Sequence, residues 1–230
     1  MTLTGSAEFA VAAADLATTL AAPATPVTPA GDATTVTVDQ PGGVAGQSFA
    51  GRKGERAYVK VTATTLAAGC GQLVLLAPDG RPIGLGCLQP GGEIDGVLLP
   101  SDGTYRIDID PDGDATGSVT LAVSLSTDRQ VTATIGGPPV TMPVATPGAQ
   151  ARITFTAEAG QTVTGTASGA TFADQCGVLQ IRGGNNAEVA EGCVRAGAGS
   201  IEVTLPRDGT YTLVLDPAHD ATGEMTLALS

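Results

Sequence analysis

The sequence predicts an all-β protein that contains two tandem antiparallel β-sandwich repeats of the jelly-roll-like kind. Three observations favour this fold class. Apolar residues alternate with polar ones in short runs, which is the period of a strand. Turn-forming sequences such as APDG, PSDG and DPDG separate these runs. The second half of the chain repeats the first, with two cysteines in each half, so we expect about seven or eight strands and one disulfide per repeat.

The composition sets limits on the core. A chain of 230 residues is long enough for two ordinary domains, each with a core of its own. The apolar fraction is 42%, but only 3% of the residues are aromatic and there is no Trp. The cores must therefore consist mainly of Val, Leu, Ile and Ala. The 32 Gly and 15 Pro residues follow no three-residue period, which is typical of many short strands joined by turns.

The repeat becomes visible when the chain is aligned with itself at an offset of 106 residues. No gap is needed from about residue 34 onward. The offset aligns both cysteine pairs, the DGTY turns and the closing strands: Cys70 with Cys176, Cys87 with Cys193, 102–105 with 208–211, and 115–124 with 221–230. We therefore predict a first repeat at residues 27–128 and a second at 129–230.

A partial copy precedes these repeats. TGSAEFAVAAAD, from Thr4, resembles TGSVTLAVSLSTD, from Thr116. Residues 1–15 are therefore predicted to be the last strand of a preceding partial repeat, followed at 16–33 by an extended Pro/Ala/Thr linker. The alternative is an orphan strand that adds to the sheet edge of a neighbouring chain, as in a filament subunit. The stretch lacks a basic start, so we expect no signal peptide in it and a chain that is part of a longer protein.

The last two strands of each repeat show the clearest alternation. In the first repeat Tyr105, Ile107 and Ile109 alternate with Arg106 and Asp108, so one face is apolar and the other polar. The apolar positions of the next strand and of both counterparts in the second repeat are Val119, Leu121 and Val123; Tyr211, Leu213 and Leu215; and Met225, Leu227 and Leu229. Further strands are expected near Val36, Phe49, Tyr58–Val61, Gln72–Leu76, Pro82–Gly86 and Ile94–Leu99. No helix longer than two turns is expected.

The cysteines predict disulfides. In each repeat the two cysteines are 17 positions apart with a turn sequence between them, so a hairpin would bring them together. Four cysteines allow three pairings, and the repeat symmetry selects Cys70 with Cys87 and Cys176 with Cys193. Each bridge would stabilise by about 3 kcal/mol and implies a secreted or cell-surface location. Zinc bound by four thiolates is disfavoured because close pairs such as C-x-x-C are absent.

One acidic run resembles a calcium loop. DIDPDGDATG, at 108–117, opens as D-x-D-x-D-G, but its twelfth position is Val119, where a calcium loop has Glu. The second copy reads VLDPAHDATG and replaces two of the four aspartates. We therefore predict a turn between two strands. Calcium bound by Asp108, Asp110, Asp112 and Asp114 is the alternative.

Charge and residue types exclude several function classes. The net charge of -12 argues against nucleic-acid partners. The sequence contains no apolar run of 18 residues, so membrane insertion is not expected. The single histidine, His219, falls in the acidic turn, and no G-x-S-x-G motif accompanies it. We therefore predict no enzyme, no catalytic residues and no cofactor. Aromatic residues are too scarce for a glycan-binding face, and Tyr58 is the one tyrosine without a place in a predicted core.

The repeat endings LPSDGTYRIDIDPDGDATGSVTLAVS and LPRDGTYTLVLDPAHDATGEMTLALS resemble the terminal strands of the bacterial pre-peptidase C-terminal domain family. IGGPPVTMPVATPGAQARITFTAEAGQTV resembles the opening of such a domain. The resemblance implies a jelly-roll-like sandwich in secreted or surface proteins that serves as a spacer, adhesion or substrate-targeting module. Some relatives bind collagen and hold calcium through acidic residues at the start of the domain. Here PAGDATTVTV and GGPPVTMPV offer one Asp and none, which argues against both properties.

These observations predict a non-catalytic extracellular module, namely a stalk, spacer or assembly segment of a larger bacterial surface or secreted protein. Its expected partner is a protein or a cell-surface polymer, or another copy of the same chain. The alternative function is that of a binding module that targets a secreted enzyme or adhesin to its substrate. An exposed apolar patch would favour this alternative.

Overall fold

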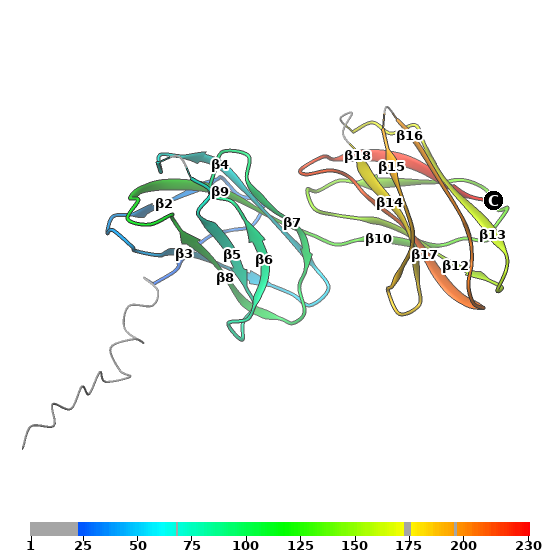
Figure 1. Ribbon diagram of the computed structural model, residues 1–230, viewed down its shortest axis with the longest axis horizontal. Helices are drawn as coiled ribbons and strands as arrows, with labels where there is room; N and C mark the ends of the chain where they lie inside the picture. Colours follow the sequence, from blue (N-terminus) through cyan, green and yellow to red (C-terminus); the bar gives the residue numbers. More distant parts are fainter. Residues whose placement is uncertain (1–22, 68, 173–175, 196) are drawn as a thin grey trace, which may run out of the picture.

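The computed structural model of this protein describes residues 23–67, 69–172, 176–195 and 197–230. These residues form eighteen strands and no helix, which confirms the predicted all-β class. Figure 1 shows two sandwiches next to each other along the long axis of the molecule. The strand predicted at residues 1–15, with its possible pairing to a neighbouring chain, lies outside the described residues, as do residues 16–22 of the predicted linker.

The first sandwich contains nine strands: β1 (Thr25–Pro26), β2 (Thr34–Val38), β3 (Ala45–Gly51), β4 (Arg56–Thr64), β5 (Gln72–Leu76), β6 (Pro82–Gly86), β7 (Glu93–Leu98), β8 (Gly103–Asp110) and β9 (Gly117–Ser126). They form a five-stranded sheet of order β1-β3-β8-β5-β6 and a four-stranded sheet of order β2-β9-β4-β7.

The second sandwich repeats this plan with nine strands: β10 (Arg129–Thr132), β11 (Val140–Val144), β12 (Ala151–Ala157), β13 (Thr162–Ser168), β14 (Gly177–Gly183), β15 (Glu188–Val194), β16 (Ala198–Thr204), β17 (Gly209–Asp216) and β18 (Gly223–Leu229). Its sheets have the orders β10-β12-β17-β14-β15 and β11-β18-β13-β16. The strand order is therefore the same in both sandwiches, as the repeat in the sequence predicts.

One strand of each sandwich is not apparent from the alternation of residues. β1 pairs in parallel with β3, and β10 pairs in parallel with β12, whereas the other pairings are antiparallel. Segments of two and four residues are too short to show a strand period. In the first sandwich this strand lies just before residue 27, the predicted start of the repeat, and its Pro26 occupies an edge position that needs no backbone donor.

The predicted apolar faces meet in two separate cores. Tyr105, Ile107 and Ile109 of β8 are fully buried in the first core, and their counterparts in β17 lie in the second. Each tyrosine ring stacks on a phenylalanine, with centroid distances of 5.6 Å for Phe49 and Tyr105 and 5.9 Å for the equivalent pair in the second core. Each tyrosine hydroxyl also donates to a backbone carbonyl four residues upstream. Two Phe–Tyr pairs therefore occupy equivalent central positions in the two cores.

The turns explain why certain short sequences recur in both repeats. The aspartate of each DGTY sequence accepts a backbone N–H from a distant turn, at 2.7 Å in both cases. The donor to Asp102 is Lys53, between β3 and β4, and the donor to Asp208 is Ala159, between β12 and β13. The hairpin β5–β6 turns at Gly80 with φ of 82°, and β14–β15 turns at Asn186 with φ of 62°. Glycine and asparagine both tolerate this left-handed conformation.

The disulfides close these two hairpins. Cys70 is bonded to Cys87 and Cys176 to Cys193, with Cα separations of 4.9 and 5.3 Å. The prediction of one disulfide per repeat is therefore confirmed. None of the described residues forms a helix long and apolar enough to cross a membrane.

Candidate functional site at the sandwich junction

The acidic run that resembles a calcium loop forms the turn between β8 and β9. The Ala115 N–H donates to the Asp112 carbonyl at 3.2 Å, and Gly113 has a left-handed φ of 57°. Asp108 lies in β8 and accepts a hydrogen bond from the Arg106 guanidinium. Within the described part of the chain, no group of three or more Asp, Glu, His or Cys side chains is placed to hold a metal ion. The turn therefore gives no support to the calcium alternative.

The structure instead gathers charged residues where the two sandwiches meet. Only Thr127 and Asp128 separate the end of β9 from the start of β10. The Arg129 N–H donates to the Gln150 carbonyl at 2.9 Å, so the chain enters the second sandwich immediately after these two residues. This short connection places the β4 and β7 edge of the first sandwich beside loops of the second. We call the contact region of Arg56, Tyr58, Lys60, Glu93, Gly96, Asp128, Gly148, Gln150, Arg152, Asp216, His219 and Asp220 the junction.

Arg56 of β4 is the central donor of the junction. Its Nε and Nη2 atoms lie 2.7 and 3.1 Å from the two carboxylate oxygens of Asp128, an arrangement that matches the planar fork of a guanidinium. Nη1 donates to the Gly96 carbonyl and Nη2 to the Gln150 Oε1, both at 2.7 Å. The side chains of Arg56 and Asp128 are only 11% and 16% exposed. Arg56 therefore links the first sandwich both to the connection and to the second sandwich.

The second sandwich continues this network inward. Gln150 donates through Nε2 to Asp216 at 2.6 Å and accepts from Arg152 at 3.0 Å. Burial raises the pKa of Asp216 to about 6, although the hydrogen bond from Gln150 opposes this shift. Burial also lowers the pKa of Arg152, while the charge of Asp128 acts in the opposite direction. The charged groups of Asp216, Arg152 and Asp128 are thus partly desolvated, and each affects the protonation of its neighbours.

A second group of bonds converges on Glu93, the first residue of β7. Its carboxylate accepts the hydroxyl of Tyr58 at Oε2 and the Nδ1–H of His219 at Oε1. Burial raises the pKa of Tyr58, and its bond to Glu93 adds to the effect. The same carboxylate raises the pKa of His219 through the hydrogen bond that it accepts. Glu93 therefore joins a tyrosine of its own sandwich to a histidine of the other.

Tyr58 and His219 are both placed in ways that the sequence does not indicate. Tyr58 is 2% exposed although it lies outside the core of its sandwich. His219 occupies the turn position of Gly113 and has a left-handed φ of 55°, which is uncommon for a residue with a side chain. Beside it, Lys60 is bonded to Asp220, which lowers the pKa of that carboxyl group.

The backbones of the two sandwiches also touch directly. The pairing of β4 with β7 is irregular between Ala57 and Val59, and Asp95 and Gly96 form the extra length of β7 opposite Tyr58. The atoms nearest to a Cβ placed on Gly96 all belong to Gly148, and a Cβ on Gly148 would lie 2.8 Å from the Cβ of Tyr58. Side chains at either glycine would therefore push the sandwiches apart.

Most junction residues are at positions where the two repeats differ, whereas Gly148, Asp216 and Asp220 are the same residue in both repeats. At the offset of 106 residues, Arg56, Tyr58 and Lys60 align with Thr162, Thr164 and Thr166. The bulge in β7 has no equivalent in β16, whose pairing with β13 is continuous. These differences between the copies were the signal by which the sequence could have indicated the junction, since residues needed only for the sandwich are expected in both repeats.

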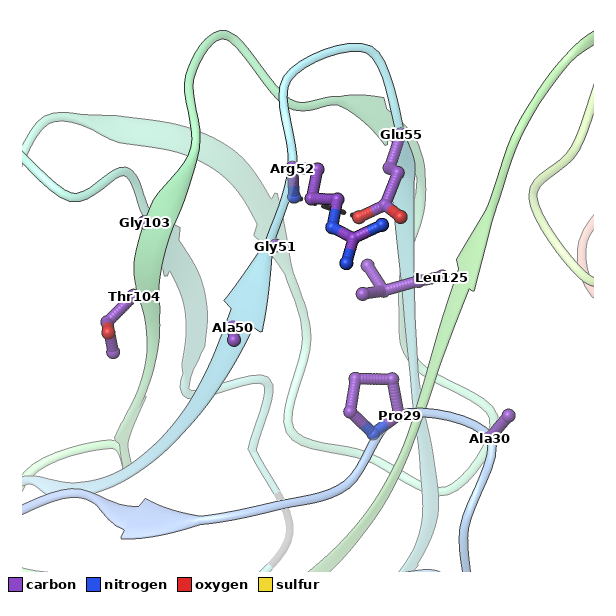
Figure 2. Close-up of a pocket in the computed structure, with 9 residues that line it drawn as sticks. All are labelled: Pro29, Ala30, Ala50, Gly51, Arg52, Glu55, Gly103, Thr104 and Leu125. Atoms are coloured by element: carbon purple, nitrogen blue, oxygen red, sulfur yellow. Dashed lines mark hydrogen bonds between the residues drawn. The ribbon is translucent and has the colours of Figure 1, made fainter.

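A separate hollow of about 630 Å³ lies at one end of the first sandwich, beside Pro29, Gly51 and Leu125. Figure 2 shows the carboxylate of Glu55 beside Arg52, whose backbone N–H it accepts at 2.8 Å. The aligned residues of the second repeat are Glu158 in place of Arg52 and Gln161 in place of Glu55. The charges of this hollow are therefore not a shared feature of the two repeats.

Comparison with known proteins gives likenesses of fold. No protein-family model and no curated protein matches the sequence. Among the solved structures that match is the pre-peptidase C-terminal domain of collagenase from Bacillus anthracis, with 9% identity over 45% of this chain and 96% of that chain and a TM-score of 0.37. The human MASP-1/3 CUB1-EGF-CUB2 structure has 9% identity over 86% of this chain and 99% of that chain, with a TM-score of 0.30.

The PBSX exported protein XepA also matches, with 10% identity over 90% of this chain and 89% of that chain and a TM-score of 0.32. At these identities the likeness concerns the fold alone. A pre-peptidase C-terminal domain, the family that the repeat endings resemble, is thus among the solved structures to which this chain is similar.

Proposed function

We propose that this chain is a non-catalytic structural module of an extracellular or cell-surface protein, in which the two sandwiches act as one rigid spacer. The observation that carries this proposal is the junction, where Arg56 bonds at once to Asp128, Gly96 and Gln150. Neighbouring domains in one chain generally move relative to each other unless their interface prevents it. Here the interface consists of partly buried ion pairs and direct backbone contact.

Three features make the junction resistant to bending. Two connecting residues, Thr127 and Asp128, are too few to act as a flexible linker. Opening the interface would leave the buried charge of Arg56 without its partner, and such losses are strongly unfavourable. It would also expose the ring of Tyr58, which is 2% exposed in the closed arrangement. A module built in this way keeps whatever lies at its two ends at a fixed distance and angle.

The location and partners follow from other properties. The disulfides Cys70–Cys87 and Cys176–Cys193 support an oxidising compartment, and the net charge of -12 supports protein or neutral polymer partners over nucleic acid. The two large apolar side chains that are most exposed among the described residues are Leu85 of β6 and Leu98 of β7. Two side chains expose less apolar area than the patches that mark binding sites, so they give no specific support to a binding module that targets an enzyme or adhesin.

The proposal is tested by asking whether the two sandwiches tumble as one body. Backbone amide relaxation of the full chain should fit a single rotational diffusion tensor for both sandwiches, and small-angle X-ray scattering should fit one elongated shape. Separate diffusion tensors for strands β2–β9 and β11–β18, in a protein whose disulfides are intact, would overturn the proposal. A measured catalytic activity would also overturn it.

A further inference from the structure

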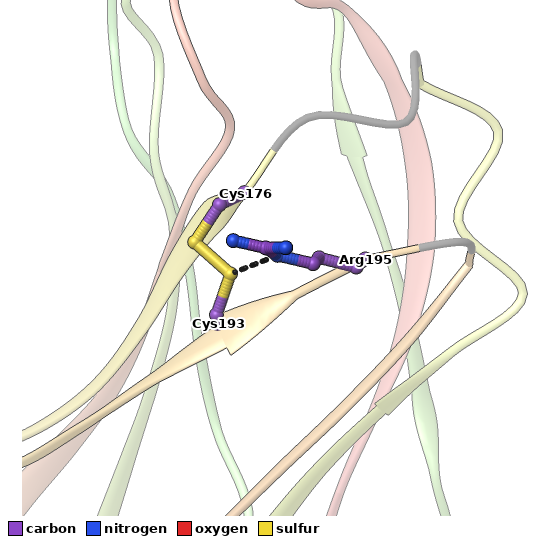
Figure 3. Close-up of a disulfide and its surroundings, with 3 residues drawn as sticks. All are labelled: Cys176, Cys193 and Arg195. Carbon is purple, nitrogen blue, oxygen red and sulfur yellow. Dashed lines mark hydrogen bonds between the residues drawn. A yellow bond between two sulfur atoms is a disulfide. The ribbon is translucent and has the colours of Figure 1, made fainter.

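The disulfide of the second sandwich has a positive charge beside it. Figure 3 shows Arg195 pointing toward the disulfide, and its Nε–H donates to the Cys193 Sγ at 3.1 Å. Cys176 and Arg195 are both exposed, so reagents in solution can reach this edge of the hairpin. The guanidinium carries its charge at every pH at which the protein is folded.

The first sandwich lacks this charge at the same place. Its disulfide closes the same hairpin with a similar Cα separation, 4.9 Å against 5.3 Å, and Cys70 is exposed as Cys176 is. At the offset of 106 residues, Arg195 aligns with Gln89, which is uncharged. The chain therefore contains two disulfides in equivalent positions that differ in the charge of one neighbouring residue.

A neighbouring cation changes the chemistry of a disulfide in a definite direction. Arginine stabilises a thiolate and so lowers the pKa of the corresponding thiol. In thiol–disulfide exchange, the sulfur that leaves does so faster when its thiol has a lower pKa. Since Arg195 bonds to Cys193 Sγ, Cys193 is the better leaving group and Cys176 the sulfur that is attacked.

We propose that the Cys176–Cys193 disulfide is a thiol-exchange site, where an external thiol becomes covalently attached to Cys176. The thiolate RS⁻ attacks Sγ of Cys176 and forms a new S–S bond. The Cys176–Cys193 bond breaks, and its electron pair remains on Sγ of Cys193 as a thiolate beside Arg195. No other oxidant or reductant is required, and the reaction reverses when the Cys193 thiolate attacks the mixed disulfide. The disulfide of the first sandwich, which has no such charge beside it at the position of Arg195, reacts more slowly with the same thiol.

The test exposes the full chain to a limited amount of reduced glutathione, traps free thiols with iodoacetamide and locates both groups by peptide mass spectrometry. Glutathione should be found on Cys176 and the alkyl group on Cys193. Modification of this pair should be about three- to tenfold faster than modification of Cys70 and Cys87, as a modest decrease in leaving-group pKa predicts. Equal rates at the two disulfides, or glutathione mainly on Cys193, would overturn the proposal.

Variants separate the charge from other differences between the hairpins. Arg195→Gln, which introduces the residue of the first repeat, should reduce the rate at Cys176 to that of the first disulfide, while Gln89→Arg should raise the rate at the first disulfide. Arg195→Lys should keep most of the preference because it keeps a positive charge. A preference that persists in Arg195→Gln, or that is lost in Arg195→Lys, would show that the charge is not its cause.

A second thiol excludes simple attraction of the reagent. Glutathione is anionic, so Arg195 could attract it without activating the disulfide. The uncharged thiol 2-mercaptoethanol should show the same preference for the second sandwich if the leaving group is responsible. A preference seen with glutathione alone would contradict the proposed mechanism.

Discussion

The Nδ1–H of His219 in the second sandwich donates a hydrogen bond to the carboxylate of Glu93 in the first. The two residues are 126 positions apart in the sequence. Protonation of the imidazole converts this hydrogen bond into an ion pair, so the contact between the sandwiches depends on pH. The partly buried carboxyl group of Asp216, in the same junction, also has a pKa above its ordinary value.

We predict that the folded, closed protein becomes more stable as the pH falls from about 7.5 to about 5.5. The pKa of His219 is raised above its ordinary value of 6.5, so its contribution is complete below that value and is lost as the pH rises through the raised pKa. The pKa of Asp216 is raised from 3.8 to about 6. An acid with a raised pKa binds more protons in the folded state, so its contribution is likewise lost as the pH rises between these values.

The measurement is the thermal unfolding midpoint at a series of pH values. Asp216→Asn and His219→Asn should each reduce the increase in the midpoint on acidification, and asparagine keeps the left-handed conformation available at position 219. A midpoint that stays constant or decreases between these pH values would contradict the prediction. Below about pH 4 the ordinary protonation of carboxylates should destabilise the protein.

Arg56→Thr, which introduces the residue found at the aligned position of the second repeat, should uncouple the two sandwiches. It removes the guanidinium that bonds to Asp128, Gly96 and Gln150 and leaves the Asp128 carboxylate, 16% exposed, without this partner. We expect a loss of about 2–4 kcal/mol in the free energy of unfolding and independent tumbling of the sandwiches. Urea unfolding and amide relaxation measure the two effects. Arg52→Thr, outside the junction, serves as the control and should leave both unchanged.

Gly96→Ala should open the junction without damage to either core. The atoms nearest to the added Cβ all belong to Gly148 of the other sandwich, with its Cα at 3.1 Å. We expect separate tumbling of the sandwiches with both disulfides and both cores intact, as shown by amide chemical shifts. Gly184→Ala is the matched control, because the nearest atom to its Cβ is the Thr210 carbonyl oxygen at 3.4 Å. An equal response in the two variants would refute this role for Gly96.

Gln47→Ile should stabilise the first sandwich. Gln47 is 0% exposed, its Nε2 donates to the Thr34 carbonyl at 3.0 Å, and its Oε1 has no hydrogen-bond partner among the described residues. The aligned residue of the second sandwich is Ile153, which is 1% exposed. Removal of the unpaired buried oxygen should raise the free energy of unfolding by about 1 kcal/mol.

The control for Gln47→Ile is the opposite substitution at the aligned position of the second sandwich. Ile153→Gln should lower the free energy of unfolding by about 2–4 kcal/mol, because it places a polar group in an apolar core. Denaturant unfolding of the two single variants decides the matter. A loss of stability in Gln47→Ile would mean that the bond to Thr34 outweighs the unpaired oxygen.

The strands could be predicted from the sequence because their pattern is local. The alternation of Tyr105, Ile107 and Ile109 with polar residues fixes which face of β8 enters the core, whatever lies beyond it. The turn at 108–117 could be predicted because the second copy keeps the same position between two strands while it replaces two of the four aspartates. The disulfides followed from the repeat, since equal spacing in both halves selects one pairing of the three.

The sequence by itself therefore determined the fold class, the strand pattern and the covalent bridges, all of which depend on neighbours along the chain or on comparison of its two copies. Only the tertiary structure decided that Tyr58 is buried against Gly148, that His219 bonds to Glu93, and that Arg195 lies beside Cys193. The junction contacts arise from the angle at which two completed sandwiches meet, and that angle is set by the connection and by the sum of many contacts. No local sequence pattern predicts this angle, because the partners of each junction residue lie in the other sandwich and not in its own strand.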